Sequence, residues 1–264
     1  MNDLKFAIMY KNIINREYMR EIYEKIEDGV KVNVEIDLEA SQYKATNPWL
    51  FSVFINYDGL DETKEGYEEF LETKESLIIA IEYEEKAKYV GSMIRDGWSE
   101  FYFYSSTSKE LNTMVPAILQ TCGYTYESNI VKDKKWNLYE TQLFPTELQQ
   151  HNMQSAKVIF LLEEEGDDLS VKRNVEHYVS FLTPTQKNKF INTLDIEGFS
   201  FKDDISSEEF EHAVALIKEH SVTYDEVTKV IAELYEYIKA EKAFYEGWST
   251  ILASDIDKVE EENI

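Results

Sequence analysis

Alternating apolar and polar residues predict strands in the first half of the chain. Residues 30–38 switch between the two classes at every position, which predicts a strand with one face toward solvent. Residues 49–57 are more uniformly apolar and predict a more buried strand. Two further runs, 89–94 and 100–104, flank Asp96-Gly97, a dipeptide typical of a tight hairpin turn. These patterns predict a sheet with antiparallel pairing.

Apolar residues that recur every three or four positions predict helices in the same half. Tyr18, Ile22 and Ile26 recur four apart ahead of Gly29, so residues 15–29 are predicted as a helix that ends at this glycine. The other predicted elements of this half are helices over residues 62–86 and 109–121 and a strand over residues 124–131.

The second half repeats this order of elements. Thr183 suits an N-cap and Pro184 suits the first helical position, which together predict a helix through Thr193. The other predicted elements are strands over residues 171–181, from 198 and over 243–252, and a helix over residues 223–241.

Residues 210–222 fit two states. Ser206 and Glu209 have the spacing of a capping box, which favours a helix. A strand over about residues 213–219 instead completes a regular β-α-β-β-α-β order, and we choose the strand. The predicted fold class is α+β with two domains, the second ferredoxin-like and the first a mixed antiparallel sheet with helices.

The boundary between the halves is predicted at the polar stretch from Pro145 to Ser155, which opens with a helix-disfavouring proline. We therefore expect domains at residues 1–150 and 156–264. Two short echoes link the halves: Asp96-Gly97-Trp98-Ser99 with Glu246-Gly247-Trp248-Ser249, and Gly123-Tyr124-Thr125-Tyr126 with Gly198-Phe199-Ser200-Phe201. Either a distant duplication or shared turn chemistry explains them.

The charge of the chain restricts its partners. It has 52 acidic and 27 basic residues, a formal charge of -25. Such a surface repels nucleic-acid phosphates and anionic lipids, because binding either depends on Lys and Arg. We therefore expect no direct nucleic-acid or membrane contact and a basic protein surface as the partner. One Cys, no signal-peptide pattern and no long apolar run predict a cytoplasmic protein, and the residue usage suggests a bacterial one.

Residues suited to catalysis or metal binding are scarce. The four histidines form no pair with helical metal-ligand spacing, and no phosphate-binding or nucleophile motif occurs, so we predict no catalytic residue, metal or cofactor. His177 is interpreted as a hydrogen-bonded residue at the surface or its border. Cys122 is interpreted as a small core residue.

The densest acidic run comprises Glu163, Glu164, Glu165, Asp167 and Asp168, around Gly166. A calcium loop needs oxygen ligands at alternating positions, which this run does not provide. It fits either a helix C-terminus stopped by Gly166 or a surface that steers a basic partner. Tyr245 and Trp248 are candidate aromatic anchors for that partner, because Trp248 follows an acidic-Gly turn. For Trp248 we favour core packing over this role.

Short motifs in both halves resemble known families. Those of the second half are Leu161-Leu162-Glu163-Glu164-Glu165-Gly166-Asp167-Asp168, Val175-Glu176-His177, residues 190–201 with Gly198-Phe199, and Tyr245-Glu246-Gly247-Trp248. In order and spacing they resemble the regulator of ribonuclease activity B family (RraB) over about residues 155–252. Those of the first half are Asn47-Pro48-Trp49-Leu50, residues 97–104 and residues 133–145. They resemble the domain of unknown function 695 family.

The resemblance implies a ferredoxin-like second half and an acidic, non-enzymatic protein that binds a ribonuclease and modulates RNA decay. The family carries a long acidic tail after its Gly-Trp motif, whereas here Asp255 to Ile264 follows. If that tail contributes to docking, the protein bound here differs.

Two hypotheses about function follow. The leading one is a regulator or adaptor that acts by protein–protein contact, including as an acidic mimic of nucleic acid. The alternative is an enzyme or small-ligand-binding protein with a site between the two domains. The oligomeric state and the role of the first domain stay open.

Overall fold

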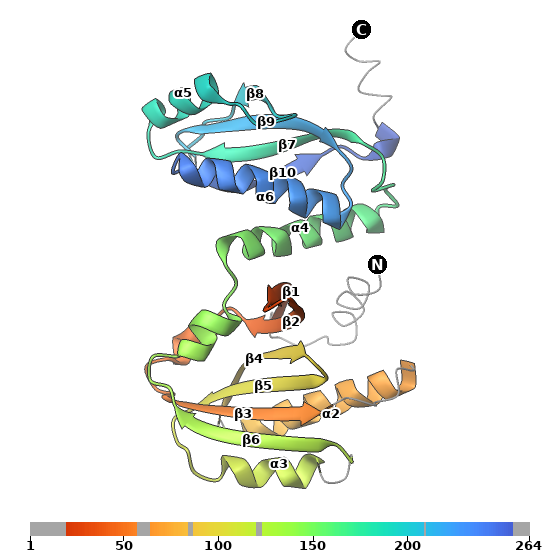
Figure 1. Ribbon diagram of the computed structural model, residues 1–264, viewed down its shortest axis with the longest axis vertical. Helices are drawn as coiled ribbons and strands as arrows, with labels where there is room; N and C mark the ends of the chain where they lie inside the picture. The colour runs from red at the N-terminus through yellow and green to blue at the C-terminus, as the bar shows by residue number, and fades with distance from the viewer. Residues whose placement is uncertain (1–19, 57–63, 84–86, 120–122, 209, 256–264) are drawn as a thin grey trace. The chain divides into compact units, whose positions relative to one another are not determined.

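The protein is described from a computed structural model that covers residues 20–56, 64–83, 87–119, 123–208 and 210–255 (Figure 1). The chain divides into two compact units, Met1–Pro145 and Thr146–Ile264. None of the helices in the described ranges combines the length and apolar character needed to cross a lipid bilayer.

The first unit contains a six-stranded antiparallel sheet in the order β1-β2-β4-β5-β3-β6. Its elements are β1 (Arg20–Glu27), β2 (Val30–Asp37), the 3-10 turn η1 (Ala40–Tyr43), β3 (Trp49–Asn56), α2 (Lys64–Glu82), β4 (Lys88–Arg95), β5 (Trp98–Ser105), α3 (Leu111–Leu119), β6 (Thr125–Lys132) and the π-helical turn η3 (Tyr139–Leu143). From β3 to β6 the order is β-α-β-β-α-β, and the β1–β2 hairpin extends the sheet beyond β4.

The prediction of a helix over residues 15–29 is wrong within its described part. Residues 20–27 form β1, which pairs with β2 along its whole length. Asp28 and Gly29 have φ values of 50° and 81°, which suit a tight hairpin turn. Ile26, placed on the supposed apolar helix face, is 66% exposed, whereas Tyr23 is buried. Cross-strand pairing therefore overrides the four-residue spacing, and residues 15–19 lie outside the described ranges.

Both faces of the first sheet are covered. Apolar residues of β3 and β5, including Phe51 and Phe103, pack with α2 and α3 in one core. On the other face Trp136 stacks on Tyr104 with ring centroids 3.9 Å apart. The Trp136 indole Nε1 donates to the carbonyl of Asn47 at 2.8 Å, so the buried ring also has a polar partner.

The second unit has the predicted ferredoxin-like order. Its elements are α4 (Glu147–Glu164), β7 (Arg173–Ser180), α5 (Pro184–Thr193), β8 (Ser200–Asp204), β9 (Ala213–His220), α6 (Tyr224–Ala240), β10 (Phe244–Thr250) and the 3-10 turn η4 (Ala253–Asp255). The sheet is antiparallel in the order β10-β7-β9-β8, the arrangement of a split β-α-β fold. The choice of a strand near residues 213–219 is confirmed, as is Thr183 as the N-cap of α5.

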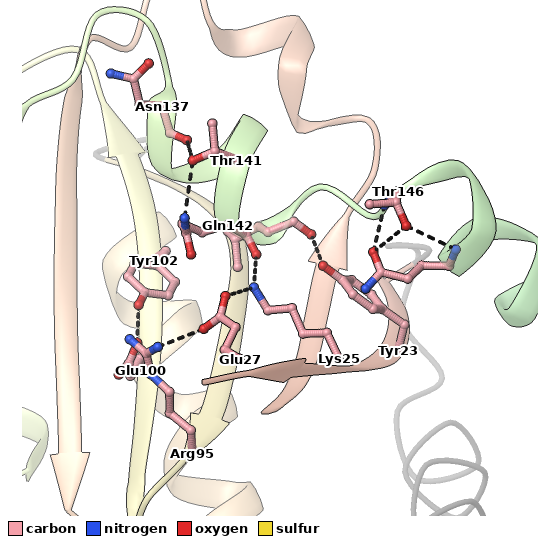
Figure 2. A network of polar contacts seen from close by, with 12 residues as sticks. Tyr23, Lys25, Glu27, Arg95, Glu100, Tyr102, Asn137, Thr141, Gln142 and Thr146 are labelled. Carbon is pink, nitrogen blue, oxygen red and sulfur yellow. Dashed lines mark hydrogen bonds and ion pairs between the residues drawn. The ribbon is translucent and has the colours of Figure 1, made fainter. Parts of the chain in front are cut away.

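The polar stretch after Pro145 forms the first part of helix α4 and not a linker. Thr146 accepts from the backbone N–H of Gln149, and the Gln149 side chain accepts from the Thr146 N–H, which forms a capping box (Figure 2). Sequence reasoning missed this start because the stretch is polar and has little apolar periodicity. The compact second unit begins at Thr146, and α4 packs along α6 and β10 through residues such as Ile159.

The two units share a strand order, yet the sequence echoes do not coincide in it. Gly97 lies in the β4–β5 turn, whereas Gly247 lies inside β10 at a shift of register. Gly123 precedes the last strand of its unit, and Gly198 precedes the second. The echoes therefore give no support for a duplication.

We expect Gly91→Ala to destabilise the first unit by about 3 kcal/mol, because the new Cβ collides with backbone. Gly91 has a φ of 156°, and a Cβ there would lie 2.4 Å from the carbonyl oxygen of Glu35 on the neighbouring strand β2. The control is Gly29→Ala at φ 81°, where nothing lies within 4 Å and the loss should be about 1 kcal/mol. Urea unfolding measures both, and equal losses would contradict the prediction.

Candidate functional site

The acidic run forms the C-terminus of α4 and the turn that follows it. Gly166 has a φ of 78°. The N–H of Asp167 donates to the carbonyl of Leu162 at 3.0 Å, and the N–H of Gly166 donates to that of Glu163 at 3.0 Å. These bonds form a Schellman motif. The prediction of a helix stopped by Gly166 is confirmed.

Three carboxylates of the run are exposed at an unfavourable place. Glu163, Glu164 and Glu165 lie at the C-terminal end of α4, where unsatisfied carbonyls carry partial negative charge. No basic residue occurs in the last turn of this helix. Each carboxylate therefore costs about 0.3–1 kcal/mol of helix stability at low salt. Helix stability does not explain the run.

Asp167 departs from its predicted role. Its side chain is 0% exposed and forms an ion pair with Arg173, whose side chain is 1% exposed. Arg173 donates to both carboxylate oxygens, and the N–H of Ala253 donates to Oδ1 at 2.8 Å. Asp167 therefore joins the end of α4, the start of β7 and the segment after β10. It has no exposed carboxylate with which to steer a partner.

Asp168 stays at the surface. Its Oδ1 accepts from the hydroxyl of Ser170 at 2.6 Å and from the Ser170 N–H at 3.0 Å. These hydrogen bonds to Ser170 lower the pKa of Asp168 below its ordinary value. It therefore stays ionised at neutral pH.

Other acidic residues lie at the same end of the second unit. The N–H of Val222 donates to the carbonyl of Leu169 at 2.9 Å, which brings the turn after α4 beside the start of α6 (Figure 1). Asp225 and Glu226 occupy the first turn of α6. We define the acidic end as Glu163, Glu164, Glu165, Asp168, Asp225 and Glu226. Exposed Lys172 and Lys229 lie among them, and Lys229 approaches Glu226 to 4.0 Å.

Tyr245 and Trp248 are not surface anchors. Both are buried, with 3% and 8% exposure, and the Trp248 Nε1 donates to the hydroxyl of Ser155 at 2.9 Å. Residues three apart in a regular strand point to opposite faces. Here the register shifts between Tyr245 and Gly247, so both rings reach the core face of β10. Glu246-Gly247 therefore lies at a β-bulge inside β10 and not in an exposed turn.

His177 is also buried, so its interpretation as a surface or border residue is wrong. Its Nε2 lies 3.1 Å from Nε2 of His220, and its Nδ1 lies 2.9 Å from the hydroxyl of Tyr245. Burial, aided by nearby His220 and Lys218, lowers the pKa of His177 to about 3. The β10 bulge and the three-strand ladder bring these groups together. Beyond its place between buried Val175 and Val179, the sequence offered no signal for this contact.

The first unit holds a polar network of paired charges (Figure 2). The guanidinium of Arg95 lies between Glu27 and Glu100, with contacts of 2.9 Å and 3.0 Å. Lys25 donates to Glu27 at 2.6 Å and to the carbonyl of Gln142 at 2.6 Å. The network ties β1 to the β4–β5 hairpin and to η3. Its pairing across distant positions gave no sequence signal.

A second cluster in this unit surrounds buried Glu35. Its carboxylate accepts from Lys74 at 2.8 Å and from the hydroxyl of Tyr89 at 2.9 Å, and Arg20 lies 3.6 Å away. Burial raises the pKa of Glu35, but Lys74 and Arg20 outweigh it and keep that pKa below its ordinary value. Glu35 is therefore a fixed anion.

No three His, Cys, Asp or Glu side chains are grouped to hold a metal ion within the residues the structure describes. Cys122, interpreted as a core residue, lies outside them.

Comparison with known proteins finds a matching family model for a part of each unit. Residues 152–250 match the family model of the Regulator of ribonuclease activity B. This match contains most of α4, the acidic run, the buried histidines and the β10 bulge. Residues 19–144 match the Family of unknown function DUF695. Both resemblances inferred from the sequence are confirmed. Neither the curated proteins nor the solved structures gave a match.

We expect Asp167→Asn to destabilise the second unit by about 3–5 kcal/mol, because it leaves the Arg173 guanidinium buried without its counter-charge. The control Asp168→Asn keeps an acceptor for Ser170 at an exposed site and should change stability by less than about 1 kcal/mol. Urea unfolding, with hydrogen exchange of peptides from β7 as the probe, measures the loss of stability in both variants. Equal effects would show that the Asp167 pair is not structural.

Proposed function

We propose that this chain is a regulator that acts by binding another protein. In this proposal the acidic end of the second unit docks on a basic surface of a ribonuclease or another component of RNA decay. No catalytic residue or cofactor takes part. The match of residues 152–250 to the Regulator of ribonuclease activity B supports the kind of partner.

The observation that carries the proposal is the placement of charge. Some carboxylates of the second unit are paired with lysines across the fold, as Asp204 is with Lys187 and Glu241 is with Lys189. At the end of α4, Glu163, Glu164 and Glu165 have no ion pair among the described residues. They also oppose the partial charge of their own helix end. Carboxylates that destabilise their own helix end fit a role in binding another protein.

The charge of the acidic end would act mainly on the rate at which a basic partner associates. Exposed carboxylates attract a basic partner over roughly one Debye length, about 10 Å at 0.1 M salt. Complementary charge raises the association rate and selects the partner more than it adds affinity. Binding should therefore weaken steeply with salt.

No observation favours the alternative of an enzyme. The buried carboxylates Glu35, Glu100 and Asp167 each face a basic side chain at close range. A general acid or base needs a group that can exchange a proton with substrate.

The test compares two variants with equal charge change. Glu164→Lys with Glu165→Lys reverses the end of α4, and it should stabilise the helix, because cations suit its C-terminus. We expect it to lower the association rate with the partner about tenfold or more at low salt. Affinity purification of the intact protein at low and high salt identifies the partner, and stopped-flow mixing measures the rate.

The matched control is Glu208→Lys with Glu211→Lys. Both glutamates are exposed in the loop before β9, at the opposite end of that strand from the acidic end. The control should keep the wild-type rate. A partner that binds both variants equally, or whose binding ignores salt, would contradict the proposal.

A further inference from the structure

A chain of hydrogen bonds crosses the three strands β10, β7 and β9 in the core of the second unit. The hydroxyl of Tyr245 lies 2.9 Å from His177 Nδ1, and His177 Nε2 lies 3.1 Å from His220 Nε2. His220 Nδ1 lies 2.7 Å from the carbonyl oxygen of Ser221. All three side chains are buried.

The carbonyl at the end of this chain determines where every proton lies. A carbonyl oxygen only accepts, so His220 carries its proton on Nδ1 and donates it to Ser221. Neutral His220 then accepts at Nε2, which requires the proton of His177 on Nε2. Neutral His177 in turn accepts at Nδ1 from the hydroxyl of Tyr245. Each donor has one acceptor, and the arrangement is complete without any charge.

We propose that this chain of hydrogen bonds makes the second unit acid-sensitive. No acceptor in it is left for another proton, so the uptake of a proton by one of its histidines loosens the acidic end. A proton added to His220 Nε2 would face the N–H of His177. To avoid this, His177 would have to move its proton to Nδ1, where it would face the hydroxyl of Tyr245. The Tyr245 hydrogen would then need a new buried acceptor.

The groups around the chain do not compensate a buried cation. Arg173 lies opposite His220 in the β7–β9 ladder, and Lys218 of β9 is also nearby. On the remaining sides, Glu226 of α6 acts on His220, and the His151 ring of α4 meets the Tyr245 ring edge-on at 5.0 Å. Arg173 is paired with Asp167 and Lys218 with Glu233, so these carboxylates already have partners, and Glu147 and Glu246 act on His151. The anion that acts on His220 is Glu226, which is partly exposed and approaches Lys229.

The direction of the pH effect follows from the folded and unfolded states. Burial lowers the pKa of His177 to about 3 and also lowers the pKa of His220. The folded unit thus binds fewer protons than the unfolded chain, whose histidines titrate near 6.5. The stabilisation is complete above pH 6.5 and is lost as the pH falls from 6.5 toward 3. Each buried histidine can raise the unfolding constant by up to about tenfold per pH unit.

The proton positions can be observed directly. All four histidines lie in the second unit, so selective isotope labelling of histidine in the full chain reports on this unit alone. At pH 7.5 we expect nitrogen chemical shifts of the Nδ1–H tautomer for His220 and of the Nε2–H tautomer for His177. Both should stay neutral at pH 5.5. The Nε2–H tautomer at His220, or a charged ring there at pH 5.5, would overturn the proposal.

A variant tests the link to stability. Gln at position 220 can donate and accept without titrating, so His220→Gln should reduce the rise in the unfolding constant between pH 6.5 and 4.5 by roughly an order of magnitude. The control His212→Gln changes a partly exposed histidine that takes no part in the chain and should keep the wild-type pH dependence. Urea titrations followed by the histidine signals give both values.

The amide of Ala253, bonded to Asp167, reports on the acidic end. Its protection factor, taken relative to the intrinsic exchange rate at each pH, should fall below pH 6, and should fall less in His220→Gln. Identical pH dependence of the wild type and His220→Gln would reject the proposal. These measurements use the isolated chain, so their outcome is independent of whether the protein partner exists.

Discussion

The second unit depends on the buried contact between Arg173 and Asp167. One guanidinium at the first residue of β7 holds a carboxylate from the turn after α4, and that carboxylate also holds the N–H of Ala253. Arg173 is six residues from Asp167, whereas Ala253 is 86 positions away, so the contact joins the turn after α4 to the segment after β10. A buried ion pair stabilises only when its geometry is satisfied, and breaking it leaves an uncompensated charge. The contact therefore determines where the rest of the acidic run points.

The protein separates two uses of its carboxylates. Buried carboxylates, such as Glu35, Glu100 and Asp167, each face a basic side chain, because an unpaired buried charge is too costly. The carboxylates of the acidic end are exposed, where solvation makes the same charge affordable and leaves it available to a partner. Within one acidic run, Asp167 belongs to the first group and Glu163, Glu164 and Glu165 belong to the second. The net charge of -25 does not distinguish these uses.

The two units share a strand order but cover their sheets differently. In the first unit, a β1–β2 hairpin extends the sheet, and Trp136 and Tyr139 close the face opposite the helices. In the second unit, α4 packs beside α6 and reaches the sheet through Ser155 and Trp248. Both units also have a bulge in the second strand of the shared β-α-β-β-α-β order, at β4 and β8. The shared strand order suits a fold in which a layer of helices covers one face of a sheet. The elements that each unit adds to this order cover apolar surface that the helix layer does not reach.

The sequence by itself determined the elements whose signals are local. Alternation predicted β2, turn chemistry predicted the β4–β5 hairpin, and capping residues predicted α5, because each depends on contacts within a few residues. The tertiary structure decided the rest. Pairing with β2 made residues 20–27 a strand, and a one-residue bulge turned Tyr245 and Trp248 inward together. It also brought Arg173 to Asp167 and joined His177 to His220 across 43 positions. Pairing between side chains across the fold leaves no local pattern, so the sequence located the acidic run but not which of its carboxylates the fold itself uses.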